Sequence, residues 1–211
     1  MLNIQIFSFN PFSENTYLVF NENKKGFIID PGNWNETETG TLQNFIENNG
    51  ISIQNILLTH AHIDHVLGLQ WAFDTYKVPV KMHQEEKEIL NRNTMSARNY
   101  GFDFKPFEGE IEFLKEGDSV FLDEDELKVL FVPGHSPGSI AFYNNAQNFV
   151  ISGDALFQGS IGRTDLYRGN HAQLLESIRT QLFTLPEETQ VYSGHGNPTQ
   201  IGFEKNHNPF F

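Results

Sequence analysis

Hydrophobic and polar positions at the start of the chain follow the short period typical of β-strands. The segments "NIQIFSF", "TYLVF" and "GFIID" combine β-branched and aromatic residues with near-alternating polarity. The polar stretch "NENKKG" separates the last two and predicts a hairpin connection, and "DPG" at 30–32 ends the third segment. The chain is therefore expected to open with three strands.

Helical spacing follows and then alternates with further strands. Residues 36–49 are predicted to form a helix that stops at Gly50, and "IQNILLT" a buried strand. Three further segments, "VLGLQWAFDTY", "VPVKMH" and "QEEKEILNR", are expected as helix, strand and helix. The second half repeats this pattern with the strands "LKVLFV", "NFVISG" and "TQVYSG" and the helix "HAQLLESIRTQLFTL". Such alternation in two halves indicates sheets with helices on their outer faces.

Residues 94–110, "TMSARNYGFDFKPFEGE", show little periodicity. Their glycines, proline and aromatic side chains fit an ordinary long loop. They fit equally a lid that shapes a pocket through Tyr100, Phe102 and Phe104. The sequence leaves both interpretations open.

Length and composition favour one domain covering residues 1–211. The chain has 211 residues, 38% of them hydrophobic, and its 20 phenylalanines suffice for a sizeable core. No stretch approaches the roughly 20 apolar residues that a membrane span needs. The first residues carry neither a basic flank nor a small-residue cleavage signal, so we expect a cytoplasmic protein without a membrane partner.

Charge and cysteine content exclude several kinds of chemistry. The chain has no cysteine, which excludes disulfides, thiolate metal sites and a cysteine nucleophile. The formal net charge of −13 argues against a nucleic-acid partner, because phosphate binding needs clustered lysine and arginine. A metal ion in this protein must therefore be bound by nitrogen and oxygen atoms.

Four predicted strands end directly before an imidazole or a carboxylate. "LLT" precedes His60, "LFVPG" precedes His135, "FVISG" precedes Asp154 and "VYSG" precedes His195. The carboxyl ends of strands are where α/β folds commonly assemble their sites, and glycine lets the backbone turn sharply there. We therefore expect these four side chains to belong to one site.

The stretch "LLTHAHIDHVLG" concentrates three histidines and an aspartate within six residues. On a helix, His60 and His62 would point to different faces, whereas in an extended loop alternate residues share a side. Asp64 and His65 are adjacent and could converge on a second point if the chain begins to curl there. The spacing therefore predicts two neighbouring metal-binding points.

The candidate ligands divide into two groups and one shared carboxylate. Three imidazoles form the first group: His60, His62 and His135. The second group consists of Asp64, His65 and His195, and Asp154 can bridge the two with its two oxygens. All seven side chains are nitrogen or oxygen donors suited to zinc, ferrous iron or manganese, and metal ions in such pairs lie about 3.5–4 Å apart.

The remaining polar candidates have simpler interpretations. Asp30 could orient a ligand histidine, but an Asx-type turn before Pro31 is favoured. Thr59 fits a second contact to His60 or an ordinary strand position. The other histidines, His83, His171 and His207, lie outside any ligand pattern and are expected at the surface or in packing.

The motifs "HAHIDH", "PGHSPGS", "SGDALF" and "SGHGNPT", taken in order, resemble those of the metallo-β-lactamase fold superfamily. Within it the chain is most similar to the small glyoxalase II-like hydrolases, also called hydroxyacylglutathione hydrolases, and the similarity runs from residue 30 to the end. The resemblance implies an αββα sandwich with two central mixed β-sheets flanked by helices. It also implies a metal site at one edge, between the sheets.

The family chemistry that the resemblance implies is thioester hydrolysis, typically of S-lactoylglutathione. Its ligand motif corresponds to the seven positions above and binds two divalent ions, with zinc expected first and iron or manganese as alternatives. A bridging hydroxide would attack the thioester carbonyl, with Asp64 orienting it and Asp154 completing the catalytic pair. The expected partner is thus a small-molecule thioester; the sequence indicates no oligomeric state.

The chain departs from full-length glyoxalase II after the last ligand. Those enzymes continue into a helical domain whose basic residues bind glutathione, whereas only "NPTQIGFEKNHNPFF" follows "SGH" here. Arg163, in "GSIGRTDL", lies roughly where the family places a lysine that contacts the thiol carrier. It could bind a substrate carboxylate or simply pair with Asp165, and both interpretations stay open.

Other activities of the superfamily remain as alternatives. "GRTD" also resembles the persulfide dioxygenases, which use one ferrous ion held by residues corresponding to His60, His135 and Asp154. A lactonase is possible, because a lactone presents a similar carbonyl. A binding protein with a vestigial site is disfavoured by the complete ligand set. A β-lactamase is disfavoured because those enzymes lack the ligand that corresponds to His65 and are exported.

Overall fold

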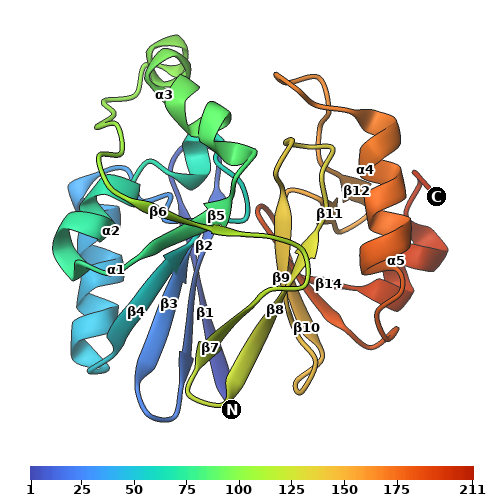
Figure 1. The fold of residues 1–211 in the computed structure, drawn as a ribbon, viewed down its shortest axis with the longest axis horizontal. Helices are drawn as coiled ribbons and strands as arrows, with labels where there is room; N and C mark the ends of the chain where they lie inside the picture. Colours follow the sequence, from blue (N-terminus) through green and yellow to red (C-terminus); the bar gives the residue numbers. More distant parts are fainter.

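The computed structural model describes residues 1–211 and contains two six-stranded β-sheets packed face to face (Figure 1). Helices cover the outer face of each sheet, which gives four layers in the order helix, sheet, sheet, helix. The αββα sandwich expected from the sequence is therefore confirmed. None of the helices combines the length and the hydropathy that a membrane span requires.

The first sheet is built from the amino-terminal half of the chain. Neighbouring strands β1 to β3 are antiparallel, and β3 to β6 are parallel, so the sheet is mixed. In spatial order its strands are β1 (Leu2–Phe9), β2 (Glu14–Asn21), β3 (Lys25–Ile29), β4 (Ser52–Leu57), β5 (Val80–His83) and β6 (Ile111–Leu114).

The second sheet comes from the carboxyl-terminal half and is mixed as well. Only β10 and β13 pair in parallel. In spatial order its strands are β14 (Thr199–Gln200), β13 (Gln190–Ser193), β10 (Phe149–Gly153), β9 (Ile140–Asn144), β8 (Asp125–Phe131) and β7 (Ser119–Leu122). A separate two-stranded ribbon, β11 (Leu156–Phe157) and β12 (Ser160–Ile161), lies beyond β10.

Alternation along the strands explains why both faces of each sheet are apolar. Phe27 and Ile29 of β3 point into the core between the sheets, and Ile28 points to the helices on the outer face. Val150 of β10 likewise packs with the outer helices of its own sheet. Successive strand residues face opposite sides, so a strand covered on both faces reads as a continuous hydrophobic run.

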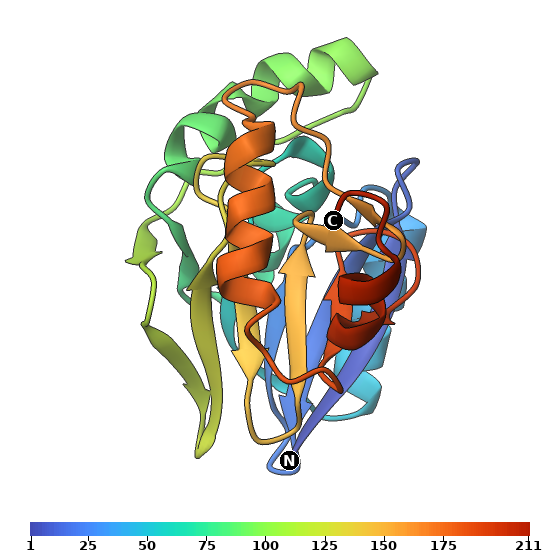
Figure 2. The ribbon, with the colours of Figure 1, turned by 90° about the vertical axis from the view of Figure 1, so that its right-hand side faces the viewer.

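The helices pack through their apolar faces on these outer surfaces. On the first sheet lie α1 (Glu36–Asn48) and α2 (Leu69–Tyr76). On the second lie α4 (His171–Ser177), continued by a π-helical turn at Ile178–Leu182, and α5 (Ile201–His207). Figure 2 shows α4 lying across the outer face of the second sheet. The helix α3 (Glu86–Tyr100) lies at the top of Figure 1, at the edge where the strands end.

Several boundaries differ from the sequence prediction. Residues 94–100, expected as part of an irregular segment, continue α3 to Tyr100, so only residues 101–110 are irregular. The helix predicted after residue 170 loses its α-helical spacing at Ile178, where the backbone widens into the π turn. The short helix α5 was not predicted, because seven residues give too little periodicity.

Backbone hydrogen bonds join the two sheets at the edge where the predicted site residues gather. The N–H of Asn15, on β2, donates to the carbonyl of Gly194 at 2.7 Å, and the N–H of Gly194 donates to the carbonyl of Gly153 at 2.9 Å. The ends of β2, β13 and β10 are thereby fixed relative to one another. Side chains from both halves of the chain can therefore be held in one place.

Candidate metal centre

The loop after β4 presents the clustered histidines. The chain is extended at His62, with φ −65° and ψ 154°, and then curls into a short 3₁₀ turn, η1, over Ile63–His65. His60 and His62 therefore face one side, and Asp64 and His65 are turned toward another. This is the change of backbone conformation that the spacing predicted.

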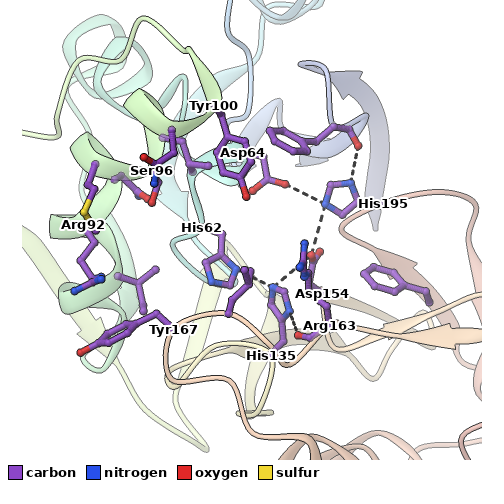
Figure 3. Close-up of a pocket in the computed structure, with 18 of the residues that line it drawn as sticks. His62, Asp64, Arg92, Ser96, Tyr100, His135, Asp154, Arg163, Tyr167 and His195 are labelled. Carbon is purple, nitrogen blue, oxygen red and sulfur yellow. Dashed lines mark hydrogen bonds and ion pairs between the residues drawn. The ribbon is translucent and has the colours of Figure 1, made fainter.

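The structure brings together the three imidazoles of the first group. His60, His62 and His135 each offer a ring nitrogen, and these atoms lie within 4.8 Å of one another. Nδ1 of His62 is 2.8 Å from Nε2 of His135, although 73 positions separate the two residues in the chain (Figure 3). A small cation could be bound by all three nitrogens.

The second group also comes together. Asp64, His65 and His195 offer ligand atoms within 4.8 Å of one another. Oδ2 of Asp64 is 3.2 Å from Nε2 of His195 and 3.8 Å from Nε2 of His65. Two imidazoles and one carboxylate thus surround a second point.

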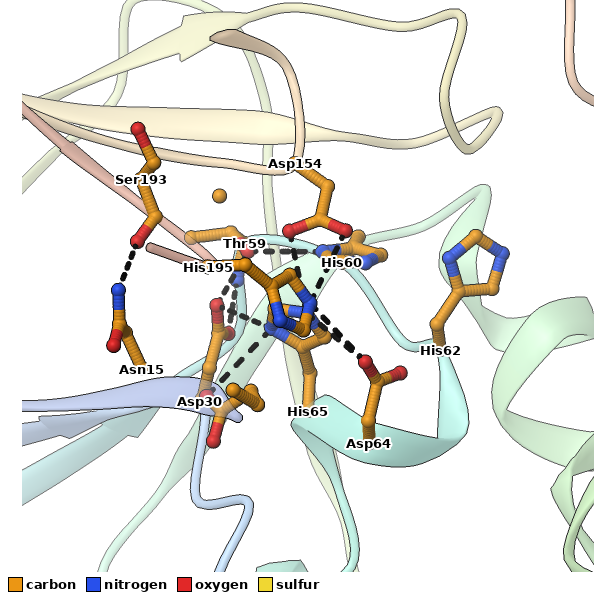
Figure 4. Close-up of polar contacts among 12 residues, drawn as sticks. Asn15, Asp30, Thr59, His60, His62, Asp64, His65, Asp154, Ser193 and His195 are labelled. Carbon is orange, nitrogen blue, oxygen red and sulfur yellow. Dashed lines mark hydrogen bonds and ion pairs between the residues drawn. The ribbon is translucent and has the colours of Figure 1, made fainter. Parts of the chain in front are cut away.

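Asp154 contacts histidines of both groups: Figure 3 shows it beside His135 and His195, and Figure 4 shows it beside His65 and His195. Its Oδ1 is 3.4 Å from Nε2 of His65. Its Oδ2 is 3.5 Å from Nε2 of His135 and 3.5 Å from Nε2 of His195. A single carboxylate is therefore shared by histidines of both groups.

Hydrogen bonds on the far side of three rings fix which nitrogen faces the site. Nδ1 of His135 lies 2.8 Å from the carbonyl oxygen of Arg163, and Nδ1 of His195 lies 3.0 Å from that of Phe12. A carbonyl oxygen only accepts, so both rings carry the proton on Nδ1 and direct the lone pair of Nε2 inward. Asp30 makes the corresponding contact to Nδ1 of His65 at 3.1 Å.

The carboxylate of Asp30 also reaches the first group through Thr59. It accepts the backbone N–H of Thr59 at 2.7 Å and the Thr59 hydroxyl at 2.5 Å. The hydroxyl oxygen is then free to accept from Nδ1 of His60, 3.0 Å away. The sequence interpretation of Asp30 as a turn residue was therefore wrong about its side chain, which is buried and contacts ligand histidines.

Three buried polar atoms that face the site have no hydrogen-bond partner. They are Nε2 of His60, Nε2 of His65 and Oδ1 of Asp154. Buried nitrogen and oxygen atoms are normally satisfied, since leaving them without a partner costs free energy. A divalent cation would satisfy all three, and the imidazole and carboxylate donors match those that such cations bind. The residues present thus fit a pair of divalent ions.

The first group consists of imidazoles that stay neutral. Burial and the neighbouring ring of His135 lower the pKa of His62 to about 3. Burial likewise lowers the pKa of His60, well below its ordinary value, and that of His135. At neutral pH these rings therefore carry free lone pairs, the form in which histidine binds metals.

The second group favours positive charge. Burial opposes charge on His65, but Asp154 and Asp64 outweigh it and raise the pKa of His65 well above its ordinary value. Burial would also raise the pKa of Asp154, yet the surrounding histidines, His65 first, hold it well below its usual range. The same electrostatic field that favours a proton favours a bound cation at this position.

Glycine is required where the backbone passes closest to the site. A Cβ on Gly194 would lie 2.0 Å from Oδ1 of Asp154 and 2.8 Å from Cε1 of His65. Gly153 has a φ of +52°, and a Cβ there would lie 2.4 Å from Oγ1 of Thr59. Any larger residue at these two strand ends would displace the shared carboxylate or the Thr59 hydroxyl.

A pocket of about 680 Å³ opens over both groups. Its floor contains side chains of both groups and Asp154, and α3 contributes one wall through Arg92, Ser96 and Tyr100 (Figure 3). Neither Phe102 nor Phe104, which the sequence associated with a lid, lines it. The histidines expected to be ordinary, His83, His171 and His207, also lie outside it.

Two arginines line the pocket, and only one pairs with a carboxylate. Arg163 donates to both carboxylate oxygens of Asp165, at 2.7 and 2.6 Å, while its own carbonyl orients His135. Arg92 lies over the ring of Tyr167, 3.9 Å from its centre, and forms no ion pair. Sequence reasoning missed Arg92 and the orienting carbonyls, since neither a single arginine on a helix nor a backbone oxygen has a sequence signature.

The sequence profile of the "Metallo-beta-lactamase superfamily" matches residues 9–195, which include every residue of both groups. The chain belongs to this superfamily. Its members share the fold described above, and the placement of the two groups between the sheets agrees with the site expected from that resemblance.

Two relatives within the superfamily match over nearly their whole length. "Probable metallo-hydrolase YqgX" of Bacillus subtilis is 39% identical over 201 residues, covering 95% of this chain and 93% of the relative. "Hydroxyacylglutathione hydrolase GloC" of Haemophilus influenzae is 35% identical over 211 residues, which cover 99% of this chain and 98% of the relative. The chain is thus similar in length to both of these hydrolases.

Two solved structures of the superfamily agree closely with the fold. The crystal structure of BLEG-1, a B3 metallo-beta-lactamase, has a TM-score of 0.89 at 37% identity, and the match covers 100% of this chain and 99% of BLEG-1. The structure of TTHA1623 in a di-iron-bound form has a TM-score of 0.89 at 35% identity, and the match covers 98% of this chain and 100% of TTHA1623. The second of these holds two metal ions.

Proposed function

We propose that the chain is a hydrolase that binds two divalent metal ions and cleaves thioesters of the hydroxyacylglutathione type. The observation that carries this proposal is the position of Asp154, whose oxygens lie within 3.5 Å of ring nitrogens from both groups. A shared carboxylate is what a pair of neighbouring ions needs.

We assign the two ions to the two groups. His60, His62 and His135 would bind one, Asp64, His65 and His195 the other, and Asp154 both. When bound, such ions supply Lewis acidity, which polarises a carbonyl group and lowers the pKa of water toward about 7. Zinc is our first assignment because it suits nitrogen and oxygen donors. Iron is the first alternative because the similar TTHA1623 structure is in a di-iron-bound form.

The side chains around the ions would orient the reactants. Asp64 lines the pocket and offers a carboxylate that can accept a hydrogen bond from the attacking water. Asp154, the second proposed catalytic residue, would hold the two groups at a fixed separation. Phe12, Phe157 and Ile161 form an apolar wall beside them, where an acyl group would be shielded from bulk water.

The choice of thioester rests on a relative and on the pocket. The Haemophilus influenzae protein that is 35% identical carries the name hydroxyacylglutathione hydrolase. Glutathione thioesters bear carboxylates, and the pocket presents Arg92, which forms no ion pair, to such groups. Arg163 would be a second contact only if its guanidinium exchanged Asp165 for the substrate carboxylate. The remaining partner proposals are negative: we propose no nucleic acid and no membrane partner.

Metal content and thioester hydrolysis, measured together, test the proposal. The purified protein should contain two ions per chain by elemental analysis and hydrolyse S-lactoylglutathione. His65→Ala should lose one ion and the activity, and His62→Ala should lose the other. Two ions without any thioester hydrolysis would reject the substrate assignment, and one ion that persists after loss of His65 would reject the dinuclear site.

Hydrolysis of a β-lactam is a second candidate. BLEG-1, a B3 metallo-beta-lactamase of similar structure, matches the whole chain at 37% identity. A strained cyclic amide, or a lactone, presents a carbonyl to the same groups. Turnover of a chromogenic cephalosporin faster than of S-lactoylglutathione would make this the primary activity.

A persulfide dioxygenase with one ferrous ion has less support. Such an enzyme would bind its iron through His60, His135 and Asp154 and would leave the group of Asp64, His65 and His195 without a metal ion. Oxygen consumption by the iron-loaded protein with glutathione persulfide, together with a single ion per chain, would establish it in place of the hydrolase.

A further inference from the structure

Glu86, the first residue of α3, is a buried carboxylate that belongs to neither metal group. Its side chain is 0% exposed. Oε2 accepts the backbone N–H of Ala61 at 2.7 Å. Oε1 accepts the backbone N–H of Gly138 at 2.7 Å and the hydroxyl of Ser136. One carboxylate is thus satisfied by three donors.

These three donors lie on the two turns that carry the first metal group. Ala61 stands between His60 and His62, and Ser136 follows His135 directly. The first turn leaves β4 of one sheet, and the second leaves β8 of the other. Glu86 therefore connects the two halves of the sandwich at the point where all three imidazoles emerge.

The same helix also binds the other backbone polar group of Ala61, its carbonyl oxygen. Asn93, two turns further along α3, donates from Nδ2 to the carbonyl oxygen of Ala61 at 2.8 Å, and its side chain is buried. Both the N–H and the carbonyl of the residue between two candidate ligands are consequently bonded to α3. The backbone at this position has little freedom to rotate.

Burying a carboxylate is costly unless its oxygens are satisfied, and a hydrophobic residue of similar volume often serves stability as well. A ligand group, in contrast, needs its members held within about 0.5 Å of the productive geometry. Charge-assisted hydrogen bonds are short and directional, so they fix the separation of two turns better than apolar packing does.

We propose that Glu86 is a positioning residue for the first metal ion, setting the distance between the His60–His62 turn and the His135 turn. This inference rests on the proposed function only in requiring that the first group binds a metal. Glu86 would thus influence metal binding although it lies 25 positions along the chain from Ala61, the residue it contacts in the His60–His62 turn. The role belongs to the geometry of the site and not to substrate contact.

The test is Glu86→Gln, which preserves volume but places an amide NH₂ against N–H and O–H donors. Cobalt(II) affinity of the metal-depleted protein is measured by competition with a chelator, together with the cobalt absorption spectrum. We expect affinity at the first group to fall by about 10–100-fold, the range seen when orienting partners of metal ligands are removed. The absorption bands of that group should shift, and the Asp64–His65–His195 group should keep its affinity.

Glu204→Gln is the matched control. Glu204 is also 0% exposed and accepts from the Gly159 N–H at 3.0 Å, the Thr199 hydroxyl at 2.5 Å and the Asn208 amide at 2.7 Å. None of these donors lies on a ligand-bearing turn. We expect Glu204→Gln to lower the melting temperature while its cobalt affinity stays within about twofold of the parent. An equal loss of cobalt affinity in Glu86→Gln and Glu204→Gln would mean that general destabilisation is responsible, and it would overturn the proposal.

Ser136→Ala covers the case in which Glu86→Gln does not fold. It removes one of the three donors and leaves the two backbone contacts, so we expect a smaller loss of cobalt affinity, several-fold, at the first group only. Parent-like affinity and an unchanged spectrum in whichever Glu86 or Ser136 variant folds would overturn the positioning role. A parent that binds no metal at the first group would instead overturn the proposed function.

Discussion

The carboxylate of Asp30 lies 3.1 Å from Nδ1 of His65, on the side of the ring that faces away from the pocket. Both side chains are buried, at 1% and 0% exposure. The same carboxylate accepts the hydroxyl of Thr59, whose oxygen lies 3.0 Å from Nδ1 of His60. A single residue at the end of β3 therefore orients one histidine of each group.

Asp30→Asn should weaken metal binding at both groups. The amide keeps one oxygen for the N–H of Thr59 but sets its NH₂ against both the Thr59 hydroxyl and Nδ1–H of His65, which contact the same carboxylate oxygen, Oδ2, in the parent. We expect metal affinity to fall by about 10–100-fold, as for other partners that orient ligand histidines. Isothermal titration of the metal-depleted variant measures the affinity of each group.

Thr59→Val separates the two effects. It removes the link between Asp30 and His60 but leaves the contact between Asp30 and His65, so the loss should be confined to the first group. If Thr59→Val weakened both groups equally, or Asp30→Asn weakened neither, the orienting role of Asp30 would be wrong.

The sequence predicted the site better than its surroundings, for a physical reason. His60, His135, Asp154 and His195 each follow a strand end, and strand ends can be recognised from an apolar run that stops at glycine or threonine. The division into two groups followed from the change from extended backbone to a turn at His62, which the structure contains.

What could not be predicted depends on side chains that meet across the fold. Asp30 reads locally as a turn residue, and its φ of 51° fits that interpretation, but its carboxylate is used 35 positions away at His65. Glu86 and Arg92 sit on a charged helix that looks like an exposed surface element. No local pattern shows that one is fully buried and the other lines a pocket, because both properties depend on how α3 meets the second half of the chain.

Asp154→Asn should weaken metal binding at both groups at once. Its two oxygens lie 3.4 Å from His65 and 3.5 Å from His135 and His195, and an amide offers only one oxygen with a weaker charge. We expect fewer than two ions per chain and a fall in thioesterase activity of at least about 100-fold. Elemental analysis with parallel kinetics checks this; two retained ions would contradict the shared role.

Asp123 gives a pH-dependent contribution to stability far from the site. It accepts from Asn21 and Asn23, each at 2.9 Å, and pairs with Lys25, joining the β2–β3 hairpin to the β7–β8 turn. These hydrogen bonds, with the Lys25 charge, lower the pKa of Asp123 to about 2. Because the folded-state pKa lies below the unfolded value, the stabilisation is present above about pH 4 and is lost as the pH falls through about 2.

Asp123→Asn should therefore be less stable than the parent at about pH 6, and the difference should shrink as the pH approaches 2. Urea denaturation of both proteins across this range measures the free energy of unfolding. Asp103→Asn, at an exposed carboxylate without a hydrogen bond, is the control and should show no such trend. A difference that stays constant with pH would contradict the role of the ionised carboxylate.

Arg92→Gln tests the proposed binding of the thioester's carrier in the pocket. The Arg92 guanidinium is held over the Tyr167 ring, and the Tyr167 hydroxyl donates to Glu88 at 2.6 Å, so the cation is oriented without being neutralised by an ion pair. Hydrogen bonds to charged groups contribute about 1.5–3 kcal/mol, which corresponds to roughly a 10-fold or larger rise in KM when one partner is lost.

The rise should appear with S-lactoylglutathione and be absent with a neutral thioester of similar acyl group, because in the proposed complex Arg92 would contact only the carboxylates of the carrier. The kcat should change little, since the metal groups and Asp64 are untouched. Arg98→Gln removes the same charge from the same helix at a position outside the pocket, and it should leave KM unchanged. An equal rise in KM for both variants would attribute the effect to the long-range charge of α3 and not to a contact with substrate.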